Sequence, residues 1–386
     1  MYLALRDLRF ARGRFLLMGT VVALIAVLGV LLSGMSTGLT DSGVSGLRAL
    51  PVSGFAFSAD ASSELFSRSI VTRTQWERWA AAPGVEAATP FGDVLAHAAV
   101  VSGASASASA NTDTGTDTGK QVDLAVFGVE PGGFLAPTPT AGRALAEGDD
   151  GVLVSRQVLD QGVRIGDRLS VERSGVVLTV VGSVGDESYG HVPTAFAPLD
   201  LWQRIQYGLP GELPAAARDV ATAVAVRTAG GFSAPAADRA AGTRWVTKQA
   251  SYSASPGYSA ESGTMALISW FLYIISALVV GSFFTVWTVQ RRPEIALLKA
   301  MGASGRYVVR DALAQAGVVL LLATGVGTVV GLAVGRTLMG SAPFALRAAP
   351  VATAALSLVV LGLLGALAAV RRITAVDPLA ALGADR

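Results

Sequence analysis

Four long apolar segments without a single charged side chain restrict the possible folds of this chain more than any other feature. They occupy residues 15–32, 265–289, 312–334 and 351–370, and none contains Asp, Glu, Lys, Arg or His. A helix that crosses the hydrocarbon core of a bilayer needs about 20 apolar residues, and a helix surrounded by lipid is apolar on every side. Four buried core helices of a soluble protein are the alternative, but they would be unusually long. We therefore expect four transmembrane helices.

The first apolar segment follows a basic leader that contains Arg6, Arg9, Arg12 and Arg14. A cleaved signal peptide also has a basic leader, but its apolar region spans only about 7–15 residues. We therefore interpret this segment as an uncleaved membrane anchor. Basic side chains also gather in residues 291–310 and 371–372. Because basic loops stay on the cytoplasmic side, we expect a multi-pass protein of the cell membrane with both termini in the cytoplasm.

This topology divides the chain into three parts. Residues 1–37 hold the cytoplasmic N-terminus and the first helix, residues 38–262 form an extracytoplasmic domain, and residues 263–386 hold the other three helices. Short β-branched runs at residues 121–126, 151–155 and 176–181 predict strands, and residues 74–82 predict a helix with Thr74 as its cap. Residues 102–119 are of low complexity and predict a loop at the tip of a hairpin. The fold class we expect is an integral membrane α-helical protein with an α+β extracytoplasmic domain between helices 1 and 2.

Composition excludes several function classes. Thirty basic and 28 acidic residues give a net charge of +2, with no long basic run, which argues against nucleic-acid binding. The chain has no cysteine and only two histidines, so we expect no disulfide and no metal centre. The spans carry no ionisable residue, which argues against an ion-coupled transporter. Residues 115–121 imitate a phosphate loop, but their glycine spacing is one residue short and no Ser or Thr follows Lys120. We therefore expect no catalytic residues and no cofactor.

The segment after the second span, residues 290–304, predicts a short amphipathic helix. Pro293 suits the first helical position, and Glu294 suits the positive end of the helix dipole. Ile295, Leu298 and Met301 lie along one flank. Such a helix can lie on the membrane surface or dock onto a soluble partner.

Residues 292–304, which read RPEIALLKAMGAS, resemble the signature of the FtsX-like permeases, the membrane subunits of MacB-type ABC systems. Residues 371–382, RRITAVDPLAAL, are similar to the closing motif of that family, and the layout of one span, a large outer domain and three further spans is also similar. Residues 1–15 and the compact outer domain look more like the DevC and haem-exporter (HrtB-type) branch.

The resemblance implies a non-catalytic membrane subunit, driven by a separate ATPase subunit that contacts the segment after the second span. The contact residues would be Glu294, Ile295, Leu298, Lys299 and Met301. It also implies two permease copies, most simply a homodimer. Gly327, Gly331 and Gly335 recur every fourth residue on the third span and could pack against the second copy or within one chain.

Four side chains are candidate substrate contacts: Tyr189, His191, Tyr252 and Tyr258. Tyrosine and histidine can both ligate haem iron, whereas the alternatives are a solvated strand-end loop and aromatic residues at the membrane interface. Three functions stay open at this point. We favour export of a hydrophobic or amphipathic compound, with haem or a drug-like molecule as substrate; the others are extraction of lipoproteins and mechanical regulation of a cell-wall hydrolase. Haem would be a substrate and not a cofactor.

Overall fold

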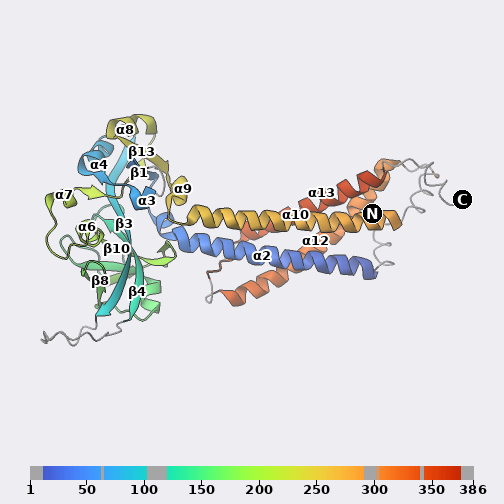
Figure 1. Cartoon of the computed structure of the whole chain (residues 1–386), viewed down its shortest axis with the longest axis horizontal. Coiled ribbons are helices and arrows are strands. Elements are labelled where there is room, and N and C mark those ends of the chain that lie inside the picture. Colours follow the sequence, from blue (N-terminus) through green and yellow to red (C-terminus); the bar gives the residue numbers. More distant parts are fainter. Residues whose placement is uncertain are drawn as a thin grey trace. The chain divides into compact units, whose positions relative to one another are not determined.

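The computed structural model describes residues 12–61, 65–101, 120–290, 301, 304–339 and 343–374. The chain forms two compact units (Figure 1). One unit combines Met1–Leu39 with Ser262–Arg386 and is called the membrane unit below. The other, Thr40–Glu261, is called the α+β domain.

Four helices are long and apolar enough to cross a membrane, which confirms the number of spans predicted from the sequence. They are α2 (Arg12–Ala49), α10 (Tyr258–Gln290), α12 (Gly305–Leu338) and α13 (Ala348–Thr374). Helix α2 continues beyond its apolar run, since residues 33–49 contain no proline that would end it. In this second part of the helix, Val44 and Leu47 are buried within the α+β domain.

Glycine allows the helices of the membrane unit to approach closely. A Cβ atom on Gly327 would lie 2.3 Å from the carbonyl oxygen of Ala23 on α2, and one on Gly331 would lie 2.9 Å from Cβ of Val30. In the same way, a Cβ atom on Gly365 of α13 would lie 2.3 Å from the carbonyl oxygen of Ala277 on α10. Only a residue without a side chain fits these crossings.

The α+β domain consists of short helices and strands. Its strands are β1 (Gly54–Ser58), β2 (Val71–Thr72), β3 (Val85–Val101), β4 (Gln121–Val129), β5 (Ala141–Gly142), β6 (Gly151–Ser155), β7 (Arg168–Val171), β8 (Val177–Val184), β9 (Ser188–Tyr189), β10 (Val192–Pro198), β11 (Val220–Ala221), β12 (Ala223–Thr228) and β13 (Thr243–Thr247). Its helices are α3 (Leu65–Arg68), α4 (Arg73–Ala80), α5 (Arg156–Asp160), α6 (Leu199–Tyr207), α7 (Ala215–Arg218), α8 (Ala234–Ala241), α9 (Lys248–Ser251) and the 3-10 turn η1 (Tyr252–Ala254).

Most strands join one 11-stranded mixed sheet, which confirms the predicted α+β class. The main path runs β13-β1-β12-β3-β4-β10-β6-β8-β5, with β7 beside β3 and β8 and β9 beside β10. The pairs β4–β10 and β6–β8 are parallel, and the other pairs are antiparallel. The predicted strands correspond to β4, β6 and β8. Helix α4 begins at Arg73, and its cap is Thr72 and not Thr74, because the Thr72 N–H donates to Oε1 of Gln75 at 2.8 Å.

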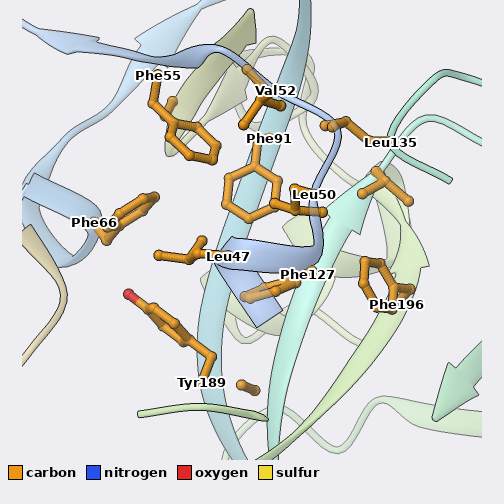
Figure 2. Packing of buried hydrophobic residues seen from close by; sticks show 14 of the residues in the cluster. Leu47, Leu50, Val52, Phe55, Phe66, Phe91, Phe127, Leu135, Tyr189 and Phe196 are labelled. Carbon is orange, nitrogen blue, oxygen red and sulfur yellow. The ribbon is translucent and has the colours of Figure 1, made fainter. Parts of the chain in front are cut away.

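The two faces of the sheet bury separate hydrophobic clusters. Ala125, Phe127 and Val129 of β4 belong to one cluster, whereas Val122, Leu124 and Val126 belong to the other, as expected when successive side chains of a strand alternate between faces. The end of α2 covers the first face, where Leu47 and Leu50 lie among aromatic rings (Figure 2). Helix α6 covers the second face.

Candidate functional site

Within the α+β domain, the end of α2 is hydrogen-bonded to the turn between β9 and β10. The N–H groups of Gly190 and His191 donate to the carbonyl oxygens of Gly43 and Ser42 at 3.0 and 3.1 Å. One turn further along α2, Oγ of Ser45 accepts from the N–H of Ser188 at 2.9 Å. We call residues 188–191 the clamp turn.

His191 extends this contact to the beginning of α10. Its Nδ1 lies 2.9 Å from Oγ of Ser42, and its Nε2 lies 3.0 Å from Oε1 of Glu261. Its backbone has a φ of 67°, in the left-handed region that side chains other than glycine rarely adopt. Contacts on both ring nitrogens and on the backbone N–H hold the residue in this costly conformation. The side chain therefore bridges the ends of α2 and α10 that belong to this domain.

The structure does not support Tyr189 as a substrate contact. Its side chain is only 1% exposed and packs edge-on against the rings of Phe66 and Phe127, with centroids 6.0 and 5.4 Å away (Figure 2). The sequence predicted a polar strand-end loop, but Leu47 of α2 covers this position and makes it part of the core. His191 also lacks a free ring nitrogen, because both have partners.

Tyr252 and Tyr258 remain partly accessible. The guanidinium of Arg48 lies 5.9 Å from the ring centroid of Tyr252, and Arg48 is itself paired with Asp41 at 2.5 Å. Tyr258 is the first residue of α10, and its ring lies near Gly43. Their role in substrate contact stays a prediction.

A buried carboxyl group, Asp93 of β3, was not singled out from the sequence. Its Oδ1 is buried without a hydrogen-bond partner among the described residues, and so are the hydroxyl groups of Tyr189 and Ser255. Burial raises the pKa of Asp93 to about 7. Burial, followed by the charge of Asp93, raises the pKa of Tyr189 well above its usual value. The sequence around Asp93 is rich in alanine and valine, and nothing in it indicates that this carboxyl group is buried or that its pKa is raised.

The membrane unit has an apolar groove of 550 Å³ between α10 and α13. Its floor is the close crossing of Gly281 and Gly365, and Trp270, Tyr273 and Leu278 are among its walls. Two hydroxyl groups in the groove, of Ser282 and Thr285, donate to carbonyl oxygens of their own helix. The groove has the size of a site for a small ligand.

The remaining residues singled out from the sequence are the predicted ATPase contacts and the three glycines of the third span. Glu294, Ile295, Leu298 and Lys299 lie outside the described residues, and Met301 lies in a turn with 69% of its surface exposed. Gly327 and Gly331 face α2 of the same chain, and Gly335 faces Phe344 and Leu346. Within one chain, this glycine face is therefore already occupied.

Comparisons with known proteins agree with this architecture. Residues 15–244 match the family model of the MacB-like periplasmic core domain, and residues 266–378 match that of the FtsX-like permease C-terminal domain. A protein named as an ABC transporter permease from Mycobacterium tuberculosis is 25% identical, and the match covers 99% of both chains. A Staphylococcus haemolyticus protein named as a hemin transport system permease, HrtB, is 32% identical over 33% of this chain and 36% of its own.

Among solved structures, the α+β part is similar to the extracellular domain of the ABC-type transporter YknZ, with 12% identity and a TM-score of 0.33. That match covers 50% of this chain and 99% of the other. The two family matches lie consecutively along the chain, first over α2 and the α+β domain and then over the last three helices. The chain therefore belongs to the MacB-like ABC transporter permeases, with an FtsX-like C-terminal domain.

Proposed function

We propose that this permease exports a hydrophobic or amphipathic compound, with haem or a drug-like molecule as the candidate substrate. A separate ATPase subunit supplies the energy, two permease copies form the transporter, and both chain termini lie in the cytoplasm. No resident cofactor takes part, and haem, where it is carried, is the substrate. The name of HrtB supports the haem candidate, although HrtB shares only part of its length with this chain.

The observation that carries this proposal is the groove between α10 and α13. Its lining is apolar apart from a few groups, including the hydroxyl of Tyr273 and the indole of Trp270. A compound dissolved in the membrane can enter such a groove sideways without crossing water, and an amphipathic compound can place its polar end beside the two aromatic side chains. The small residues Gly281, Gly365 and Ala368 leave the room that a bulky apolar group needs.

The experiment fills the groove. In the permease reconstituted with its ATPase, Ala368→Phe should reduce substrate-stimulated ATP turnover at least fivefold, because the added ring occupies the space of the substrate. Leu364→Phe is the matched control, since Leu364 lies one turn away on α13, is 52% exposed and does not line the groove. The panel of probes contains hemin, a lipophilic dye and a quaternary ammonium detergent. Equal stimulation of both variants by every active probe would refute the groove as the substrate site.

Mechanical signalling without transport is a second candidate, and the clamp turn favours it. Helices α2 and α10 each carry residues of both units, and within the α+β domain their ends are tied to the clamp turn through Ser42, His191 and Glu261. A movement of these helices would therefore pull directly on the sheet through β9 and β10. A reconstituted complex whose turnover responds to none of the probes, yet depends on His191, would favour this function.

A further inference from the structure

Part of strand β3 has no neighbouring strand along one of its two edges, in the gap between β12 and β7. We call this part the free edge. On the side opposite β4, strand β12 pairs with the residues from Val85 to Phe91, and β7 pairs with those from Ala98 to Val101. Strand β4 covers the other side from Gly92 to Ala99. Residues 94–96 therefore have a neighbouring strand on only one side.

The register shows which backbone groups point to this free edge. The carbonyl oxygens of Phe91 and His97 accept hydrogen bonds on this side, from Thr222 and Glu172, both at 3.0 Å. Because the N–H and C=O of successive residues alternate between the two sides of a strand, the N–H and C=O of Leu95 must point the same way. Among the described residues, neither group has a hydrogen-bond partner. Native sheets normally cover or protect such an edge.

A pocket of 410 Å³ opens beside the free edge. Its lining is mixed: Arg173, Gln206 and Tyr207 are polar, whereas Val171 of β7 and Ile205 of α6 are apolar and almost fully buried. Leu95 also lines the pocket and is 48% exposed, but its side chain lies near Gly190, so the part of Leu95 that the free edge offers is its backbone. The pocket therefore offers a mixed polar and apolar surface next to unpaired backbone donors and acceptors.

The charge at the rim of the pocket is positive. Arg173 lines it, is exposed, and makes no ion pair within the described part of the chain. Two carboxylates of neighbouring strand residues already have partners: Glu172 accepts from Nε2 of Gln121 at 2.9 Å, and Asp123 pairs with Nδ1 of His97 at 2.5 Å. The guanidinium is therefore free to bind a carboxylate of a ligand.

We propose that this free edge of β3 binds an extended peptide segment of a partner protein. The segment pairs its backbone with the N–H and C=O of Leu95, places one side chain in the mixed pocket beside Tyr207, and places an acidic side chain or a terminal carboxylate at Arg173. Strand addition explains the combination of features, because an unpaired edge supplies backbone hydrogen bonds and the adjacent pocket supplies selectivity. A small carboxylate would use Arg173 and the apolar wall but would leave Leu95 unpaired.

The test uses the full chain in lipid nanodiscs and a fluorescent hexapeptide of alternating threonine and valine that ends in aspartate. Fluorescence anisotropy should show saturable binding, and Arg173→Gln should weaken it about tenfold, as expected for loss of a charge-assisted hydrogen bond. Arg168→Gln is the matched control, since it removes the same charge from β7 at a position outside the pocket. Hydrogen exchange of the segment that contains Leu95 should slow in the presence of the peptide.

Two further probes separate the peptide from other ligands. A hexapeptide with N-methylated valines keeps the side chains and the carboxylates but loses the backbone donors of the valines, which point to one side of an extended peptide, and it should bind at least tenfold more weakly. Octanoate should not displace the unmodified peptide at equal concentration. Equal binding of the methylated peptide, full displacement by octanoate, or an unchanged affinity of Arg173→Gln would each overturn the proposal.

Discussion

At the scale of the residue, the carboxyl group of Asp93 links pH to the stability of the α+β domain. Its pKa rises from 3.8 to about 7 because it is buried, so the folded state holds the proton more tightly than the unfolded state. The free energy of unfolding should therefore fall by about 1.4 kcal/mol per pH unit as the pH rises from 3.8 to about 7. Above that range the penalty is complete.

Asp93→Asn removes the ionisable group, so the variant should be more stable than the wild type at pH 8 and should lose most of this pH dependence. Urea unfolding of the full chain in detergent, followed by tryptophan fluorescence at pH 5 and pH 8, measures the difference. Asp160→Asn, an exposed position at the end of α5, should leave the pH dependence unchanged. Parallel pH profiles for the wild type and Asp93→Asn would contradict the assignment.

His191 allows a test of backbone strain. Its φ of 67° disfavours any side chain, so His191→Gly and His191→Ala lose the same contacts to Ser42 and Glu261 but differ in strain. We expect the alanine variant to be less stable than the glycine variant by about 1 kcal/mol. Thermal unfolding of both full-length variants in the same detergent gives the comparison, and equal stabilities would show that the turn changes its conformation once the imidazole is removed.

Sequence reasoning reached these residues only in part. The segment that contains Tyr189 and His191 was singled out because it is polar and follows a strand, and His191 does make polar contacts. Tyr189 was assigned the wrong environment, because its burial depends on Leu47, which is remote in sequence and comes from a helix whose length was underestimated. Local polarity cannot reveal such a long-range contact.

At the scale of the element, the glycine face of α12 sets how closely α2 can approach. The four-residue spacing of Gly327, Gly331 and Gly335 predicted a close helix contact from sequence, but the pattern could not say which helix makes it. The structure places α2 against Gly327 and Gly331.

The charge-free runs predicted the spans well, since the bilayer imposes a length on any helix that crosses it. The order of the strands in the sheet depends on pairing between distant segments, and it was not predicted.

Gly327→Ala should destabilise the membrane unit by about 1–3 kcal/mol, because the added Cβ would lie 2.3 Å from the carbonyl oxygen of Ala23 and would push α2 away. Gly325→Ala is a matched control on the same helix, where no atom lies within 4 Å of an added Cβ, and it should have no such cost. The midpoint of thermal unfolding in detergent compares the two. A loss of stability in the control as large as that in Gly327→Ala would point to an effect of glycine on the helix itself.

At the scale of the whole molecule, the orientation in the membrane can be tested without background labelling, because the chain has no cysteine. The distribution of basic residues predicts that Ser107 lies outside the cell and Ser304 in the cytoplasm. Ser107→Cys should therefore react with an impermeant thiol reagent in intact cells, whereas Ser304→Cys should react only after the membrane is opened. Reaction of Ser304→Cys in intact cells would reverse the proposed orientation.

Coupling to the ATPase is the other whole-molecule property, and Leu298 is its most direct test. The chain belongs to the ABC transporter permeases, which implies a partner ATPase subunit. The sequence predicts that Ile295, Leu298 and Met301 form an apolar flank in the segment between the second and third spans. Each aliphatic side chain buried in a partner contributes about 1.5–3 kcal/mol before the costs of association.

Leu298→Asp would place an unpaired carboxylate in that contact at a cost of several kcal/mol. We therefore expect the variant to insert into the membrane normally but to lose the ATPase on co-purification, while Leu298→Met, which keeps the apolar volume, retains it. ATP turnover of the reconstituted complex should fall in parallel with assembly for Leu298→Asp and stay near the wild-type rate for Leu298→Met. If the aspartate variant assembles and turns over like the wild type, the ATPase must contact a different segment of the permease, and the apolar flank then has another role at the membrane surface.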